Sequence, residues 1–158
     1  RRRPRSGVVS TWAPEMERTL RRLEDTREIY DLFMRYGHFL DTHDWERFGG
    51  LFTDTGQLVS KGGVGTATGP EEIARLFDER LKDVPVGSFH LFSNIAIDVD
   101  GDTASATSMW AYLTADDGGW PRLLMFGHYA DELVRDGEEW KFQKRDIDRV
   151  MGSPPYQR

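Results

Sequence analysis

The sequence of 158 residues predicts a single α+β domain, with helices in its first half and an antiparallel sheet in its second half. Apolar residues recur at helical spacing between residues 29 and 40. From residue 88 onward they alternate with polar residues, and Asp-Gly pairs separate the alternating runs. Helices that precede the strands, rather than alternating with them, favour packing on one face of a curved sheet.

The first half of the chain contains the signals of three helices. From Pro14, Leu20 and Leu23 predict a helix that can join the next one. Thr42 to Asp44 breaks this helix, and Asp44 is a good N-cap for a short helix through Phe52. A proline and two acids at residues 70–72 begin a third helix, which ends at residues 83–85. The apolar face of the long helix is predicted to comprise Ile29, Leu32, Phe33, Tyr36, Phe39 and Leu40.

Between these helices, residues 53–56 predict a turn, residues 57–60 a short strand and residues 61–68 a glycine-rich loop. Four longer strands are then predicted at residues 88–99, 103–114, 121–135 and 139–150. We expect one domain over residues 14–151, a basic tail at residues 1–13 and a second tail at residues 152–158.

Composition excludes several classes of function. The net charge of −6, with no basic stripe in the body of the chain, argues against nucleic acid as a partner. No run approaches the roughly 20 apolar residues of a membrane span. Cysteine is absent, which excludes disulfides and cysteine-ligated metals. We expect a cytoplasmic protein with no membrane contact.

The strands present aromatic residues and two histidines on what we predict to be the inner face of the sheet. Asp41 borders the apolar stripe of the long helix, so its carboxylate points toward the same hollow. Burying such a charge is costly without a partner. A period of two predicts these inward sets: His90, Phe92 and Asn94; Trp110, Tyr112 and Thr114; Leu124, Phe126 and His128; Trp140 and Phe142.

An Asp–His pair in an apolar hollow can serve as a general base. The carboxylate of Asp41 would fix the tautomer of His90, and the neutral ring could then take a proton from a substrate. A hydroxyl from Tyr36 or Tyr112 could donate to a carbonyl oxygen and stabilise a developing enolate.

Simpler interpretations remain open for these residues. His90 could be a satisfied core histidine, and Asp41 could close the helix corner by accepting from backbone amides. His38 and His43 are expected on the solvent side. Asp41, His90 and His128 would also suit a facial iron site of two histidines and one carboxylate.

Four stretches of the sequence are similar to SnoaL-like proteins of the nuclear transport factor 2-like superfamily. They are LDTHDWERF, SFHLFSN, DGDTA and GHYADELVRDGEEWKFQKRDI, and the resemblance covers roughly residues 23–150. It is strongest to the scytalone dehydratase branch. The resemblance implies a cone-shaped α+β barrel, a strongly curved sheet wrapped around the N-terminal helices, with one deep pocket.

The resemblance also implies cofactor-independent elimination by an Asp–His dyad that matches Asp41 and His90, with Tyr36 as a pocket tyrosine. The sequence departs from scytalone dehydratases at Leu40 and Ser60, where that branch has tyrosines. It also has Thr114 near the position where that branch has its second histidine. The Asp–His dyad is therefore retained, whereas the residues expected to contact the substrate differ from those of scytalone dehydratases.

We expect a lyase, a dehydratase or related enzyme, that acts on a hydrophobic cyclic carbonyl compound without a cofactor or a metal. Asp41 and His90 would be catalytic, and the expected substrate-binding residues are Tyr36, Trp110, Tyr112, Phe126 and His128. Two alternatives stay open: an isomerase or cyclase using the same dyad, and a non-catalytic ligand-binding or assembly subunit like the small subunits of ring-hydroxylating dioxygenases. The superfamily resemblance implies a homodimer or homotrimer.

Overall fold

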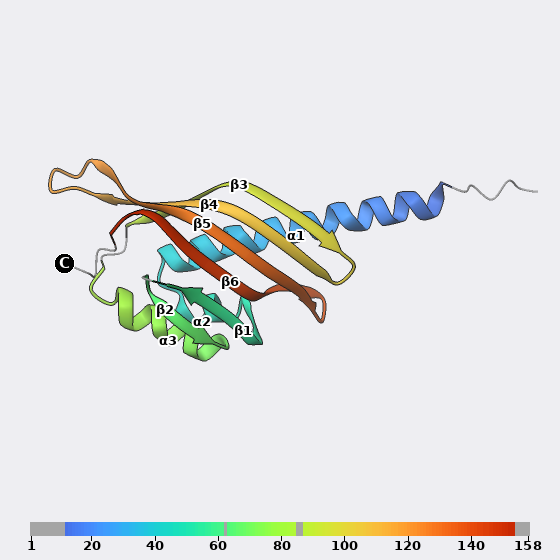
Figure 1. Cartoon of the computed structure of the whole chain (residues 1–158), viewed down its shortest axis with the longest axis horizontal. Coiled ribbons are helices and arrows are strands. Elements are labelled where there is room, and N and C mark those ends of the chain that lie inside the picture. The colour runs from blue at the N-terminus through green and yellow to red at the C-terminus, as the bar shows by residue number, and fades with distance from the viewer. Residues whose placement is uncertain (1–11, 62, 85–86, 154–158) are drawn as a thin grey trace, which may run out of the picture.

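The computed structural model describes residues 12–61, 63–84 and 87–153 and confirms the α+β fold class. Its elements in chain order are α1 (Ala13–Asp41), α2 (Trp45–Gly49), β1 (Phe52–Ser60), β2 (Gly65–Thr68), α3 (Pro70–Leu81), β3 (Phe89–Asp100), β4 (Thr103–Ala115), β5 (Pro121–Asp136) and β6 (Glu139–Gly152). The sheet curves over α1, and α2 and α3 lie beside β1 and β2 (Figure 1). Of the predicted tails, residues 1–11 and 154–158 lie outside the described residues.

All six strands form one sheet in the order β2-β1-β6-β5-β4-β3. The meander from β3 to β6 is antiparallel, as its Asp-Gly turns predicted, whereas β1 pairs with β6 in parallel. The resemblance predicted a barrel, but the sheet is not closed: β2 and β3 stand at its two edges.

The region after the first long helix differs from the prediction. α2 ends at Gly49, before Phe52, and β1 includes residues 53–56, which had been predicted as a turn. Part of the predicted loop at residues 61–68 is the strand β2. The predicted strand at residues 57–60 is the second half of β1, and periodicity missed the first half because the pairing with β6 shifts register between Phe52 and Gln57.

α1 is continuous over 29 residues, as its joined apolar patterns predicted. Its C-terminal half packs one face against the sheet, while residues 12–24 are exposed. In Figure 1 this N-terminal part projects beyond the edge of the sheet. The buried residues of α1 are Asp25, Ile29, Leu32, Phe33, Tyr36, Gly37 and Leu40.

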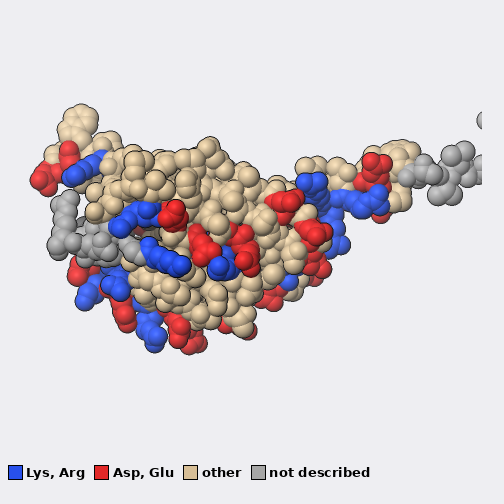
Figure 2. All heavy atoms as spheres, viewed as in Figure 1, with Lys and Arg blue, Asp and Glu red and all other residues tan. Residues whose placement is uncertain are grey.

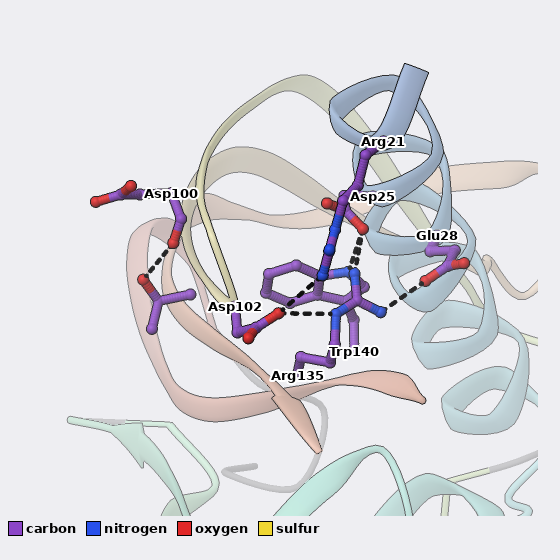
Figure 3. A network of polar contacts seen from close by, with 8 residues as sticks. Arg21, Asp25, Glu28, Asp100, Asp102, Arg135 and Trp140 are labelled. Atoms are coloured by element: carbon purple, nitrogen blue, oxygen red, sulfur yellow. Dashed lines mark hydrogen bonds and ion pairs between the residues drawn. The ribbon is translucent and has the colours of Figure 1, made fainter. Parts of the chain in front are cut away.

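A polar network fixes α1 to the end of the sheet (Figure 3). Arg135 of β5 contacts the buried carboxylate of Asp25 and lies 3.2 Å from Asp102 and 3.6 Å from Glu28. Its guanidinium also stacks 4.9 Å above the ring of Trp140. This network sets the position of α1, and therefore of the residues at its C-terminal end.

The inner faces of β3 and β4 follow the prediction only in part. On β4 the even-numbered residues from Ala104 to Tyr112 are buried, as expected. On β3 a register shift between Ser93 and Ala96 changes the phase. Asn94 sits in this bulge with a φ of 52° and is exposed, so its predicted inward position is wrong.

Within the described residues, no helix is both long enough and apolar enough to cross a membrane.

Candidate active site

Asp41 and His90 meet where the end of α1 approaches the start of β3. The Oδ1 atom of Asp41 lies 2.7 Å from Nδ1 of His90. Both carboxylate oxygens also lie 3.1 Å from the backbone nitrogen of His90, which donates to them. The side chains are only 18% and 13% exposed, respectively. The pair is therefore held at two points and shielded from most of the solvent.

The corner after α1 positions the Asp41 carboxylate. Thr42 donates from its hydroxyl to the carbonyl of His38, and His43 adopts a left-handed conformation with a φ of 57°. Asp44 then accepts from the backbone N–H of Arg47 and begins α2, as predicted. The chain reverses within three residues, so Asp41 faces the sheet at the last turn of α1.

The contact to Asp41 assigns a role to each ring nitrogen of His90. Because a carboxylate can only accept, Nδ1 carries the proton in the neutral ring and Nε2 is the acceptor. The ring of Tyr112 lies 4.8 Å from the ring of His90. His90 lines a cavity, so this pair stands at the wall of a space that a ligand can enter.

The cavity opens between the end of α1, α3 and the inner face of the sheet. Its volume is about 70 Å³, and about 700 Å³ when the open solvent at its mouth is included. Of the predicted residues, Tyr36, Asp41, His90, Trp110 and Tyr112 line the cavity.

Phe126 and His128 do not line this cavity, so their predicted roles in substrate binding have no support here. His128 is exposed and lies in a groove on the opposite face of the sheet. From Gly127 onward the buried residues of β5 are the odd-numbered Gly127, Tyr129, Asp131 and Leu133, which is the opposite phase to the prediction, whereas Leu124 is half-buried and packs against the core.

The surroundings of Gly127 explain why the odd-numbered residues of β5 are the buried ones. A Cβ atom at residue 127 would lie 2.7 Å from atoms of the Trp110 indole, which occupies the inward position. The indole nitrogen donates to the carbonyl of His128 at 3.2 Å. Both phases of β5 carry apolar residues, so alternation alone could not choose between them, but a glycine flanked by large residues was a usable signal.

The position of His128 also rules out the alternative of an iron site formed by Asp41, His90 and His128. His128 lies on the other face of the sheet from Asp41 and His90. Among the described residues, no group of three or more His, Cys, Asp or Glu side chains could hold a metal ion.

His43, which was expected on the solvent side, is half-buried. It stacks 4.9 Å from Trp45 and lines the cavity.

Sequence reasoning missed a buried ion pair beneath the cavity. Arg145 of β6 contacts Asp131 of β5 through two hydrogen bonds, of 2.7 and 2.8 Å, and both side chains are fully buried. The guanidinium lies 4.1 Å from the ring centres of Tyr36 and Phe142 and 4.2 Å from that of Tyr129. At these distances the aromatic faces stabilise the cation.

Each partner of this ion pair favours the charged form of the other. Burial works against the charged form of Arg145, but the charge and hydrogen bonds of Asp131, together with Tyr36 and Tyr129, outweigh burial and raise the pKa of Arg145 above its ordinary value. Burial raises the pKa of Asp131, and Arg145 opposes that shift. The pair thus places the charged guanidinium of Arg145 against the rings of Tyr36 and Tyr129.

Two cavity tyrosines remain neutral hydrogen-bond donors. Burial raises the pKa of Tyr36, and nearby Arg145 offsets part of this effect. Burial also raises the pKa of Tyr112. The hydroxyl of Tyr36 is buried and makes no hydrogen bond of good distance and angle in the described chain. It lies close enough to Arg145 and Tyr129 for both to lower its pKa. Nη1 of Arg149, another cavity residue, is likewise buried without a partner there.

The fold and this geometry can now be compared with known proteins. The family model of the SnoaL-like domain matches residues 21–146, which is most of the chain. The chain belongs to the SnoaL-like family. This confirms the resemblance seen in the sequence, and the SnoaL-like segment includes Asp41, His90 and the ion pair of Asp131 and Arg145. A comparison with curated proteins finds no match.

Solved structures share the SnoaL-like fold over nearly the whole chain. An NTF2-like protein with a cystatin-like fold from Novosphingobium aromaticivorans has a TM-score of 0.79 and 26% identity, covering 96% of this chain and 97% of that protein. A scytalone dehydratase candidate from the same organism has a TM-score of 0.71 and 25% identity, with coverages of 89% and 98%. An Asp-to-Asn variant of Rv3472 from Mycobacterium tuberculosis, a protein of unknown function, has a TM-score of 0.73 and 25% identity, with coverages of 89% and 78%.

Proposed function

We propose that this protein is a cofactor-independent lyase that removes water, or a comparable leaving group, from a flat cyclic carbonyl compound. The observation that carries the proposal is the contact of 2.7 Å between Asp41 and Nδ1 of His90 at the wall of an apolar-lined cavity. The likeness to a scytalone dehydratase candidate supports the same class of reaction.

In the proposed reaction, Nε2 of His90 takes a proton from the carbon next to the substrate carbonyl. The C–H electron pair forms the enolate double bond, and Asp41 stabilises the imidazolium. As the carbonyl reforms, the new carbon–carbon double bond expels hydroxide from the adjacent carbon. The imidazolium returns its proton to that hydroxide, so water leaves and His90 is neutral again.

Tyr36 and Arg149 are the groups that would stabilise the enolate oxygen. Each has a buried donor atom without a partner in the described chain, and both residues line the cavity. Tyr112, beside the His90 ring, is a third neutral donor. Donors already aimed at a developing charge need no reorganisation during the reaction, which makes them effective.

The shape of the cavity limits the substrate. An interior of about 70 Å³ accepts only one edge of a ring, and the rest of the substrate would extend into the solvent at the mouth. A flat bicyclic ketone fits this description better than a bulky, saturated one. The retained dyad and the changed positions Leu40 and Ser60 suit a substrate that differs from scytalone.

Proton abstraction can be tested without knowing the leaving group. We would incubate the protein with 1-tetralone, a flat bicyclic ketone, in D2O and follow α-proton exchange by NMR. We expect exchange above the buffer rate, reduced about 10²- to 10⁴-fold in Asp41→Asn and His90→Gln. His128→Gln is the matched control, because that histidine is exposed on the other face of the sheet, and it should exchange like the parent.

Elimination itself is then tested with 3-hydroxy-1-tetralone by mass spectrometry. Loss of one water, dependent on His90, supports a lyase. Conversion with no change in mass would instead indicate an isomerase. If folded His90→Gln protein exchanges and converts these probes as fast as the parent, the proposed base is wrong.

A further inference from the structure

α1 carries a second apolar stripe that nothing in the described chain covers. Its members are between 40% and 62% exposed and are separated by four, three, seven and four residues. This is the spacing of positions a and d in a heptad, with Arg27 at the position between the third and fourth members. We call this stripe, Met16, Leu20, Leu23, Tyr30 and Met34 together with Arg27, the α1 seam.

The α1 seam faces away from the domain. At 3.6 residues per turn, Leu20, Leu23 and Arg27 lie on the side of the helix opposite to the buried Asp25 and Ile29. The inward side is already occupied, because α1 is fixed to the end of the sheet by the network of Figure 3. α1 therefore cannot turn the seam inward without breaking these contacts.

The projecting part of α1 has little support of its own. Residues 12–24 are all exposed, and Figure 1 shows this part extending past the sheet. A helical segment of this length is marginal in water unless an apolar face is covered. Three heptads of a and d positions are the pattern that a second helix covers, rather than a small ligand or a strand.

Charges beside the seam favour a second copy of this chain in an antiparallel arrangement. Glu17, Glu24 and Asp31 flank one side of the seam at intervals of seven residues. Two parallel copies in register would place Arg27 against Arg27. Two antiparallel copies with their seams in full overlap would instead bring each Arg27, which lies 3.7 Å from Asp31 of its own helix, beside Glu24 of the other copy, where opposite charges attract.

We propose that the α1 seam binds the α1 seam of a second copy, forming an antiparallel two-helix contact at the centre of a homodimer. Met34, the seam member nearest to Asp41, lies seven positions before it, about 10 Å at 1.5 Å per residue, and on the opposite side of the helix from Tyr36 and Leu40, which line the cavity. The contact therefore leaves the cavity open. This inference stands independently of the proposed reaction.

The outer face of the sheet is the competing surface, since Figure 2 shows mostly uncharged atoms over β3 to β5. Leu20 and Leu91 allow a matched comparison because they are 53% and 56% exposed, on α1 and on β3 respectively. We would measure mass by light scattering for the parent, Leu20→Glu and Leu91→Glu proteins. We expect the parent and the Leu91→Glu protein to be dimers and the Leu20→Glu protein to be a monomer.

A monomeric parent at high concentration, a Leu20→Glu protein that remains a dimer, or a Leu91→Glu protein that dissociates would each overturn the proposal. Circular dichroism and the melting temperature keep a folding defect apart from a loss of contact, because both leucines are exposed. Orientation is tested with Ala13→Cys, in a chain that otherwise has no cysteine. An antiparallel dimer gives no disulfide between the two introduced thiols on oxidation, whereas a disulfide would show parallel helices and refute the arrangement.

Discussion

The carboxylate of Asp41 holds His90 at two points, the ring nitrogen Nδ1 at 2.7 Å and the backbone N–H at 3.1 Å. The backbone contact fixes the place of the residue, and the ring contact fixes its tautomer. These two roles can be separated by mutation, because an amide oxygen can still accept from the backbone N–H.

Asp41→Asn should therefore separate structure from catalysis. The asparagine can keep one backbone contact, so we expect the melting temperature to fall by only a few degrees. Its NH2 group would favour the wrong tautomer of His90, and proton exchange should drop at least about 10²-fold. Exchange by NMR and thermal unfolding measure the two effects. A variant with parental exchange would show that the tautomer is irrelevant.

Tyr36→Phe should reduce activity without reducing stability. The hydroxyl makes no hydrogen bond of good geometry in the described chain and only approaches Arg145 and Tyr129, so we expect its removal to cost little stability. Loss of one donor to a developing oxyanion costs about 10²- to 10³-fold in kcat. Comparing kcat with KM distinguishes this from weaker substrate binding. An unchanged kcat would assign Tyr36 to the core alone.

Arg145→Met should strongly destabilise the fold, because it leaves the Asp131 carboxylate buried without a partner. Breaking a buried pair in this way costs about 3–5 kcal/mol. The double variant Arg145→Met/Asp131→Leu should recover much of that loss. Urea unfolding of the two single variants and the double variant gives the coupling free energy.

Lys144→Met is the control for this cycle. Lys144 is the next residue on β6 and pairs with Asp146 at 2.8 Å, but at the surface. We expect no measurable loss of stability there. Equal losses at residues 144 and 145 would mean that burial of the Arg145 pair is not what makes it costly to break.

Gly127→Ala should destabilise the protein by about 1–3 kcal/mol, because overpacking displaces neighbouring groups. The added methyl would meet the Trp110 indole and the backbone of Asp148. Gly50→Ala is the control, since residue 50 has helical angles and its nearest neighbour would lie at 3.5 Å. Chemical unfolding compares the two. Equal stabilities would show that Trp110 moves aside without cost.

Stability should decrease above about pH 10. Burial raises the pKa of Tyr129 well above its ordinary value of 10.0, and it raises the pKa of Tyr36 from the same value. Above pH 10 these tyrosines ionise in the unfolded chain while they remain neutral in the folded one, so rising pH favours unfolding. Below pH 10 they contribute no slope. Urea unfolding at several alkaline pH values measures this effect, which Tyr129→Phe should weaken. A flat profile would contradict the shift.

The sequence was sufficient to predict the helices, the meander and the pairing of Asp41 with His90. Asp41 stood out because a carboxylate beside an apolar helical stripe needs a partner, and His90 lay on a strand whose alternation was clear. β5 was predicted in the wrong phase because both of its faces are apolar, and only the approach of Trp110 to Gly127 decides between them.

The ion pair of Asp131 and Arg145 could not be found in this way. Each residue lies among other charged residues, in the runs YADELVRD and KFQKRDID, which resemble solvated strand faces. On β5 the buried phase runs unbroken through Gly127, Tyr129, Asp131 and Leu133. On β6 the register shift opposite Glu132 and Leu133 changes the buried phase after Phe142, which turns Arg145 inward. Such bulges depend on packing against neighbouring strands, which local periodicity does not encode.

The parallel pairing of β1 with β6 has a consequence for how the protein is made. β1 is synthesised before β3, β4 and β5, yet its partner β6 follows all three in the sequence. Until residues 139–152 have been synthesised, β1 and β2 form a hairpin with an unpaired edge, and the Asp131 carboxylate has no guanidinium to meet. Pairings between distant segments are slow to form and expose apolar surface meanwhile. A nascent chain would therefore complete its cavity only after residues 139–152 have been synthesised, and until then the β1–β2 hairpin keeps an exposed edge.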